Sequence, residues 1–273
     1  MSKISETFGL LKAQRRAAFM PFLVAGDPDI ATTAALIKAA AAAGADLIEL
    51  GVPFSDPIAD GPVIQASYYR ALDKGFRVSQ LFELMSRLRA EGVTVPVVCM
   101  VSQTLVFKRT ASVFFESSRK AGFDGLIIPD LPAGYEGDAS AQAAQGGLDL
   151  IFLIAPTTQA DRRSLIARKS QGFIYYISTT GITGARAVLP EDLGANVKDI
   201  QSRTATPVCV GFGVSKPDQA AAVAKIADGV IVGSALVKRT EEGRVQGLTG
   251  AKLVDYVAVM MRELAEATHN GRG

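Results

Sequence analysis

Eight short apolar runs alternate with helix-forming stretches, and this alternation limits the folds open to the chain. Each run has the length and β-branched content of a buried parallel strand. The stretches between them, such as residues 31–44 and 79–92, are helix-forming, and several end at a glycine. Strand then helix, repeated eight times, predicts an α/β fold of the (β/α)8 TIM-barrel type. The predicted strands are FMPFLVA from 19, LIEL from 47, VVCM from 97, GLIIP from 125, LDLIFLI from 148, FIYYIS from 173, PVCVG from 207 and GVIVG from 229.

The length and composition suit one such barrel. The chain has 273 residues, and no linker rich in Pro, Gly or Ser divides it, so we expect a single TIM-barrel domain over residues 1–273. The first residues, MSKISETFGLLKAQRR, lack a signal-peptide core and predict a short extra N-terminal helix. Since no segment approaches the roughly 18 apolar residues that span a bilayer, we expect a cytoplasmic protein without membrane contact.

Charge and rare residues narrow the chemistry. The formal net charge is only +2, which favours a small-molecule ligand over nucleic acid. Cys99 and Cys209 lie in apolar, strand-like runs and indicate buried packing in a reducing compartment. The only histidine, His269, lies four residues from the end in a predicted polar tail, which argues against imidazole catalysis and histidine-rich metal sites. Acid–base chemistry is therefore left to carboxylates, tyrosines or lysines.

Two of the connections that follow strands are oversized. About 50 residues separate the second strand from the third, and about 35 separate the sixth from the seventh. In (β/α)8 barrels the loops after the strands build the active face, and long loops are often binding loops. We therefore expect function in LIELGVPFSDPIADGP at 47–62 and in TTGITGARAVLP at 179–190.

Glu49 interrupts the apolar run of the second strand. Alternation places it on the opposite face from Ile48 and Leu50, either inside the barrel near its mouth or against a surrounding helix. Both environments are poor in water, and desolvation raises the pKa of a carboxyl group toward neutrality. Glu49 is thus a candidate proton donor and acceptor, the alternative being a structural pair with a buried Arg or Lys.

Asp60 and Asp56 follow in a loop stiffened by prolines. Asp60 precedes Gly61 and Pro62, so it is either a catalytic base or part of a helix cap in which Asp60 or Gly61 is the N-cap residue. For Asp56, which precedes Pro57, we favour a turn or interface role.

Glycines after the seventh and eighth strands predict a phosphate site. VGFGVSKP at 210–217 and VGSALV at 232–237 each lead from a strand through glycine into a predicted helix. Backbone N–H groups and a helix dipole can bind phosphate there. For any one glycine, a tight turn or helix packing is the alternative. The candidates are Gly211, Gly213, Gly233 and Ser234, with Gly184 closing over the site from the long loop.

Large side chains at the strand ends could line a pocket for a flat apolar group. Four of them are candidates, although core packing explains any single one: Phe22, Met100, Tyr175 and Phe212. Together with the carboxylates and the glycines, they suggest a substrate with an aromatic part, a polar linker and a phosphate.

The segment LIELGVPFSDPIADGPVIQ at 47–65 resembles the most specific signature of the tryptophan synthase alpha subunit family. FMPFLVAGDPD, IIPDLP, FLIAPTT, FIYYIS, GITGAR, VGFGVSKP and ADGVIVGSA follow in that family's order. The resemblance implies retro-aldol cleavage of indole-3-glycerol phosphate to indole and glyceraldehyde 3-phosphate, with no metal or organic cofactor. It also implies a tryptophan synthase beta subunit as partner, in an alpha2beta2 heterotetramer.

The resemblance also implies roles for individual residues. Glu49 would act as general acid/base at C3 and at the glycerol hydroxyl, and Asp60 would act at the indole nitrogen with Tyr175 assisting. The ring would lie against Phe22, Ile64, Met100 and Phe212, the closing loop would contribute Thr183 and Gly184, and the phosphate would bind at Gly213, Gly233 and Ser234.

One segment departs from the family pattern. Family members often carry a Thr-Tyr-Tyr-Asn-Pro type segment after the third strand, where this chain has VSQTLVF at 101–107. That region contacts the beta subunit in the family, so the departure concerns docking and activation rather than the proposed acids. Because the loop around Asp56 and Pro57 matches, a beta partner is still expected. A mainly regulatory subunit with little turnover of its own, and a phosphosugar isomerase, stay open as alternatives.

Overall fold

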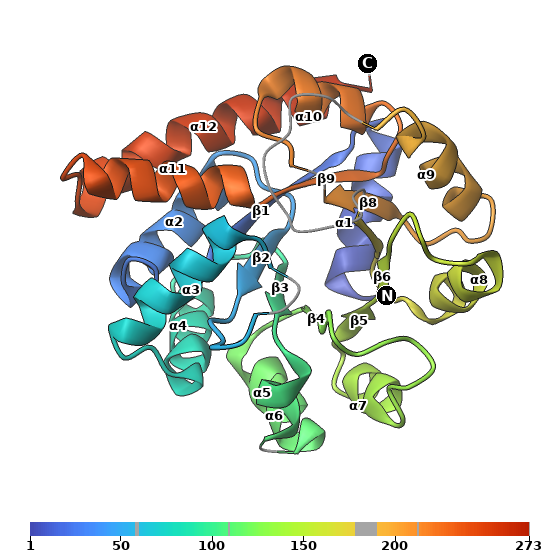
Figure 1. Cartoon of the computed structure of the whole chain (residues 1–273), viewed down its shortest axis with the longest axis horizontal. Coiled ribbons are helices and arrows are strands. Elements are labelled where there is room, and N and C mark those ends of the chain that lie inside the picture. Colours follow the sequence, from blue (N-terminus) through green and yellow to red (C-terminus); the bar gives the residue numbers. More distant parts are fainter. Residues whose placement is uncertain (58–59, 109, 178–189, 212, 273) are drawn as a thin grey trace.

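Helices surround a parallel sheet in the computed structural model of the chain (Figure 1). The structure describes residues 1–57, 60–108, 110–177, 190–211 and 213–272. The predicted site residues Thr183, Gly184 and Phe212 lie outside these ranges. Within the described residues one sheet contains nine strands: β1 (Ala18–Val24), β2 (Ile48–Gly51), β3 (Val97–Met100), β4 (Gly125–Ile127), β5 (Asp149–Ile151), β6 (Leu153–Ile154), β7 (Ile174–Ile177), β8 (Val208–Gly211) and β9 (Gly229–Val232).

The strand order confirms the predicted barrel. The order is β5-β4-β3-β2-β1-β9-β8-β7-β6, and each neighbouring pair with an assigned register is parallel. The predicted fifth strand, residues 148–154, is interrupted at Phe152. Its first part, β5, pairs with β4, and its second part, β6, pairs with β7. One stretch of chain therefore joins both edges of the sheet, as in a (β/α)8 barrel.

Helices follow the strands as the sequence predicts. Asp29 caps α2 by accepting a 2.7 Å hydrogen bond from the Thr32 N–H, and Gly122, in the left-handed region, ends α6. The helices in the described residues are α1 (Lys3–Ala13), α2 (Ile30–Ala42), α3 (Pro62–Asp73), α4 (Val78–Ala90), α5 (Gln103–Phe107), α6 (Ala111–Ala121), α7 (Ala139–Gln145), α8 (Ala160–Lys169), α9 (Leu193–Gln201), α10 (Pro217–Ala224), α11 (Ser234–Val245) and α12 (Gly250–Asn270).

Strand alternation divides the core in two. Side chains such as Phe19 and Cys99 point outward and pack with the surrounding helices. Met20, Val98 and Cys209 point inward and fill the barrel. Both cysteines are free and buried, which confirms their predicted packing role.

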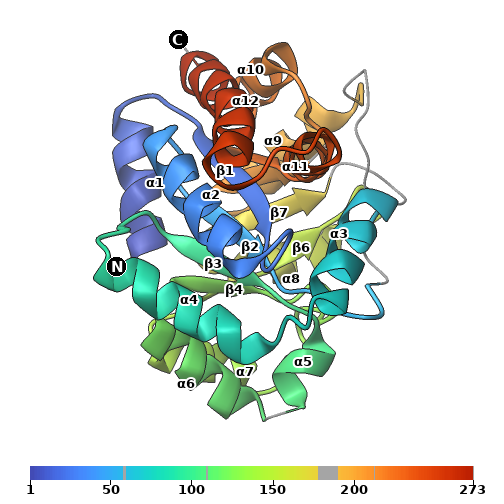
Figure 2. The same cartoon turned by 90° about the vertical axis from the view of Figure 1, so that its left-hand side faces the viewer.

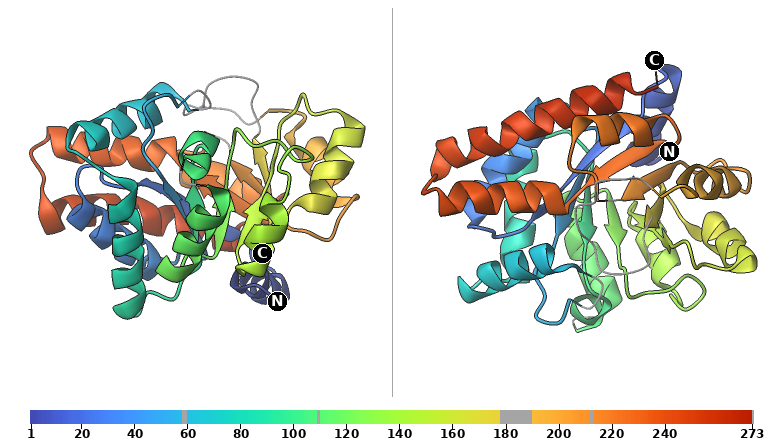
Figure 3. Two further views of the ribbon diagram at one scale, coloured as in Figure 1. Left: turned by 90° about the horizontal axis from the view of Figure 1, so that it is seen from below. Right: turned by 45° about the horizontal axis from the view of Figure 1, so that its top comes forward.

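The N-terminal helix forms the floor of the barrel. Ile4, Phe8 and Leu11 of α1 belong to the interior cluster, and the ring of Phe8 lies 6.1 Å from that of Phe173, centroid to centroid. In Figure 3, α1 and α3 lie at opposite ends of the barrel. The predicted extra helix is thus confirmed, and it covers the end of the barrel opposite the loops that follow the strands.

The expectation of a polar C-terminal tail is wrong. Helix α12 runs to Asn270 because Leu264 and Thr268 on its inner face are buried. His269 lies on this helix with its Nε2 atom 2.8 Å from Asp46, a carboxylate that also accepts a hydrogen bond from the Phe19 N–H. The histidine therefore ties α12 to the start of the barrel strands.

The described part of the chain contains no helix long and apolar enough to cross a membrane. Across the same residues, no cluster of three or more His, Cys, Asp or Glu side chains could hold a metal ion. The prediction of one domain over residues 1–273 stays a prediction.

The barrel floor gives a first testable prediction. Phe8→Ala should lower the free energy of unfolding by about 3 kcal/mol, because it removes a buried ring and leaves a cavity beneath the strands. Leu10→Ala on the same helix is the matched control, because Leu10 is 66% exposed and its loss should change stability by less than about 0.5 kcal/mol. Urea unfolding measures both. Equal effects of the two substitutions would contradict the assigned floor.

Candidate active site

Glu49 points into the barrel. Its neighbours Ile48 and Leu50 belong to the outer core, whereas Leu47, two positions before Glu49, belongs to the interior cluster. Because strand side chains alternate, Glu49 shares the inward face with Leu47. Its Cα pairs with that of Phe22 on β1, and its side chain is buried. Of the two locations left open by the sequence, the barrel interior is therefore the one observed.

The Glu49 carboxyl group has no cationic partner among the residues that the structure describes. Both of its oxygens are buried without a hydrogen bond, and within the described residues no salt bridge involves it. The structural pair with a buried Arg or Lys is therefore not formed. Burial, helped by the negative charge of Asp60, raises the pKa of Glu49 to about 8. At neutral pH this group is mostly a protonated acid.

Asp60 lies at the end of the loop that connects β2 to α3. The N-cap residue of α3 is Gly61, followed by Pro62, so the Asp60 side chain is not the cap. Its backbone carbonyl accepts a 2.8 Å hydrogen bond from the Gln65 side chain. Burial raises the pKa of Asp60 to about 6, which leaves it mostly ionised at neutral pH.

Tyr175 completes the polar centre from β7. Burial raises the pKa of its phenol well above 10, and the charges of Glu49 and then Asp60 raise it further. Tyr175 therefore keeps its proton and can donate a hydrogen bond. The structure brings the three predicted catalytic residues into one electrostatic environment, with an acid, a base and a neutral donor.

An apolar wall surrounds this centre. Phe22 and Ile64 form one buried cluster with Tyr68, and Met100 packs against it. Helix α3 contacts α11, which contributes Val237 to the same cluster (Figure 2). Three of the predicted ring-binding residues thus lie together. Tyr68 was not predicted, although it stands four residues after Ile64 and so shares its helix face.

Two glycines make room for aromatic rings. A Cβ atom on Gly51 would lie 2.5 Å from Cζ of Phe22 and 2.9 Å from the Tyr68 hydroxyl oxygen. A Cβ atom on Gly211 would overlap the ring of Tyr175. Gly211, a candidate for phosphate binding, therefore serves close packing, which was the alternative reading.

The predicted phosphate residues lie beyond β8 and β9. Gly233 is the N-cap of α11 and Ser234 is its first residue, so the positive end of that helix dipole lies at the open end of the barrel. A Cβ atom on Gly233 would lie 3.5 Å from Phe22, which links this end to the apolar wall. Gly213 lies between β8 and α10. Their binding of phosphate stays a prediction.

A cavity of about 580 Å³ opens beside Asp60, a volume within the range of small-molecule sites. Its far wall comes from the segment that departs from the family pattern: the Ser102 hydroxyl and the Gln103 N–H donate hydrogen bonds to the Asp130 carboxylate, at 2.9 and 2.7 Å. Sequence reasoning did not identify these groups, because they come from different loops. The lining residues are Val52, Phe54, Asp56, Pro57, Asp60, Tyr68, Met100, Val101, Ser102, Thr104, Pro129 and Asp130.

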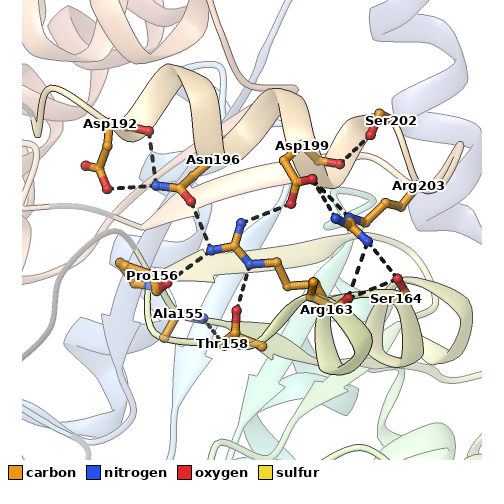
Figure 4. A network of polar contacts seen from close by, with 11 residues as sticks. Ala155, Pro156, Thr158, Arg163, Ser164, Asp192, Asn196, Asp199, Ser202 and Arg203 are labelled. Carbon is orange, nitrogen blue, oxygen red and sulfur yellow. Dashed lines mark hydrogen bonds and ion pairs between the residues drawn. The ribbon is translucent and has the colours of Figure 1, made fainter.

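An arginine network supports the elements on both sides of β7 (Figure 4). The Arg163 guanidinium group on α8 donates to the carbonyls of Thr158 and Pro156 in the loop after β6, at 2.9 and 3.0 Å. It also donates to Asn196 and Asp199 on α9, at 2.9 and 3.0 Å. The two connections that flank the Tyr175 strand are thereby joined by one side chain.

The fold and the site together define a class of protein. A (β/α)8 barrel with one neutral and one charged carboxyl group at its open end is a barrel enzyme suited to acid–base chemistry. Comparison with known proteins narrows the class. The family model described as "Tryptophan synthase alpha chain" matches residues 8–269, and the chain belongs to that family.

Individual relatives agree with this assignment. The tryptophan synthase alpha chain of Rhodopirellula baltica is 47% identical over 244 residues, 89% of this chain and 88% of that protein. The alpha chain of a Geobacter species is 44% identical over 271 residues, 99% of each chain. A tryptophan synthase structure from Mycobacterium tuberculosis superposes with a TM-score of 0.89 at 34% identity, covering 98% of both chains. The alpha subunit from Legionella pneumophila gives a TM-score of 0.90 at 32% identity, with the same coverage.

The family membership places the chain among the aldol-type carbon–carbon lyases. The family's reaction is the cleavage of indole-3-glycerol phosphate in tryptophan biosynthesis. The resemblance seen in the sequence is thereby confirmed.

The buried acid makes stability depend on pH. The folded-state pKa of Glu49, about 8, lies above its ordinary value of 4.5, so the stabilisation present below pH 4.5 is lost as the pH rises through 8. The Glu49→Gln chain has no ionisable group at this position, so it should keep this stabilisation as the pH rises. Between pH 5 and pH 9 the substitution should therefore gain about 3 to 5 kcal/mol relative to the parent chain.

Denaturant unfolding at the two pH values measures this gain. Glu263→Gln, at an exposed position on α12, is the control and should show no pH-dependent gain. If the free energies of unfolding of the parent and Glu49→Gln chains changed with pH in the same way, the pKa of Glu49 in the folded protein would be ordinary.

Proposed function

We propose that the chain cleaves indole-3-glycerol phosphate with Glu49 as the general acid at C3 and Asp60 as the acceptor at the ring nitrogen. One observation carries the proposal: Glu49 is buried inside the barrel with both carboxyl oxygens unpartnered, in the field of Asp60. A protonated carboxyl group held this way is able to deliver a proton to a carbon atom of the substrate.

The proposed steps balance without any other reactant. Glu49 donates its proton to C3, and the positive charge that develops on the ring is stabilised by the ionised Asp60 near the N–H group. The bond between C3 and the glycerol carbon then breaks, and its electron pair restores the aromatic ring. The glycerol hydroxyl becomes an aldehyde and returns its proton to Glu49, while Tyr175 assists as a neutral hydrogen-bond donor.

The remaining residues hold the two ends of the substrate apart. The ring packs against Phe22, Ile64 and Met100, which form the apolar wall. The phosphate binds at the start of α11, where backbone N–H groups and the helix dipole favour an anion. The phosphate-binding end of the site is formed by Gly213, Gly233 and Ser234. The site is completed by three residues outside the described ranges, Thr183, Gly184 and Phe212.

We also propose a tryptophan synthase beta subunit as partner, in an alpha2beta2 assembly. The cavity opens among the loops after β2, β3 and β4. Two large side chains that follow β3 and β4 along the chain, Phe107 on α5 and Tyr135 before α7, are 46% and 77% exposed. We further propose one domain over residues 1–273 and a cytoplasmic location, which suits two free thiols.

Substitution of the two carboxyl groups tests the assignment. Glu49→Gln should lower kcat for indole release by about 10²- to 10⁴-fold, because it removes the only proton delivered to C3. Asp60→Asn should lower kcat/KM by about 10²-fold, because the charge on the ring loses its counterpart. Indole release is measured with the isolated chain and again with a beta chain added. Asp73→Asn, an exposed carboxylate at the far end of α3, is the control and should leave the rate unchanged.

Three outcomes would each reject one hypothesis about the function. If both substituted chains turn over at the parent rate, the acid–base assignment fails. If the parent chain alone shows appreciable turnover, the mainly regulatory role is excluded. A rearranged sugar phosphate instead of indole and a triose phosphate would indicate an isomerase.

The opposite ionisation of the two groups predicts a bell-shaped pH profile. kcat/KM should rise through about pH 6, as Asp60 ionises, and fall through about pH 8, as Glu49 loses its proton. The substrate phosphate also ionises near pH 6. The Asp60→Asn chain separates the ionisation of Asp60 from that of the phosphate, because any acidic limb that persists in this chain belongs to the substrate. A profile that stays flat from pH 6 to pH 9 is incompatible with these roles.

A further inference from the structure

Tyr68 is a buried tyrosine of α3 that no step above uses. Its ring belongs to the cluster formed by Phe22, Val24, Ile64 and Val237, and its side chain is almost entirely buried. The ring therefore contributes to packing at the open end of the barrel.

The Tyr68 hydroxyl lies above the end of β2. A Cβ atom on Gly51 would lie 2.9 Å from it, and Gly51 is the next inward-facing residue after Glu49 on that strand. Tyr68 also lines the cavity together with Asp60 and Met100. Within the described part of the chain, the hydroxyl has no hydrogen-bond partner. The residue lines the cavity rather than the closed core, and no hydrogen bond among the described residues accounts for the position of its hydroxyl.

The surroundings of Tyr68 make it a donor. Burial raises the pKa of its phenol well above 10, and the negative charge of Asp60 raises it further, more than the charges of Glu49, Cys99 or Tyr175. For Tyr175 the order is reversed, with Glu49 before Asp60. The pKa of Tyr175 thus responds more to Glu49, and the pKa of Tyr68 responds more to Asp60.

We propose that the Tyr68 hydroxyl donates a hydrogen bond to the ionised Asp60 carboxylate and turns its other oxygen toward the substrate ring. Tyr68 is then a positioning residue for the cleavage reaction. This role rests on the proposed function of Asp60. The two groups are not hydrogen-bonded in this structure, so the Asp60 side chain has to turn toward Tyr68 across the cavity that both line, while the ring of Tyr68 stays where α3 and Gly51 place it.

The groups that face Asp60 favour such a donor. Glu49 from β2, Tyr175 from β7, Asp56 from the same loop and Asp130 from the loop after β4 are either acidic or neutral. None of these described groups carries positive charge. The Asp60 carboxylate therefore needs a neutral hydrogen-bond donor to stabilise its negative charge. Such a hydrogen bond to the charged form lowers the pKa of a carboxyl group.

Tyr68→Phe keeps the ring and removes only the hydroxyl, so packing should survive. The acidic limb of the kcat/KM profile for indole release should move up by about one pH unit. Tyr69→Phe is the matched control, an adjacent tyrosine that is 46% exposed, and should leave the limb unchanged. In an Asp60→Asn background, Tyr68→Phe should have no further effect, because the two residues act through one another.

A second measurement does not need turnover. The chain is labelled with ¹³C at aspartate carboxyl groups, and the Asp60 signal, identified by its loss in Asp60→Asn, is titrated. Tyr68→Phe should raise the pKa of Asp60 by about one unit, whereas Tyr69→Phe should not change it.

Each outcome has one meaning. An Asp60 pKa that is the same in Tyr68→Phe and the parent overturns the proposal. A higher KM with an unmoved acidic limb also overturns it, because the hydroxyl would then contact the substrate itself. An effect of Tyr68→Phe that adds to the effect of Asp60→Asn overturns it as well. If the parent chain releases no indole, the proposed function fails, while the carboxyl titration still decides whether Tyr68 acts on Asp60.

Discussion

The burial of one unpaired carboxyl group, Glu49, is the constraint on which the active end of this barrel depends. Strand alternation turns the side chain inward, and α1 covers the opposite end of the barrel. Gly51, two residues on, leaves space for Phe22 and Tyr68 to cover the same strand end. Because it is buried and forms no salt bridge with any described residue, the carboxyl group holds its proton at neutral pH. Its acidity thus follows from packing rather than from a catalytic partner.

The second carboxyl group differs because its environment differs. Asp60 lies in a loop beside the cavity, and its pKa of about 6 is raised less than that of Glu49. The pKa of Glu49 also responds to the charge of Asp60, so the protons belong in part to the pair. Once Asp60 is ionised, ionisation of Glu49 becomes harder. The repulsion therefore favours the state with one acid and one base, which is the state that a retro-aldol cleavage needs.

Much of this arrangement could be predicted from the sequence, and the limits have physical causes. The eight strands and the buried Glu49 follow from periodicity, which is a local property. The sequence offered either Asp60 or Gly61 as the cap of α3, and either phosphate binding or close packing for Gly211. The choice within each pair, like the pairing of His269, depends on which groups meet in space. Tyr68 shows the same limit, because its spacing from Ile64 predicts a shared helix face but not what that face approaches.

An unpaired buried acid costs stability, so the rest of the barrel has to offset it. The large apolar core does so in part, and polar networks hold the elements around the site. Arg163 joins the connections on both sides of β7, and Asp27, buried after β1, binds Arg70 of α3 at 2.7 Å. Neither arginine is among the charges that shift the pKa of Glu49 or Asp60, and a positive charge beside Glu49 would favour its ionised form. These two arginines therefore position elements around the site without neutralising its acidic centre.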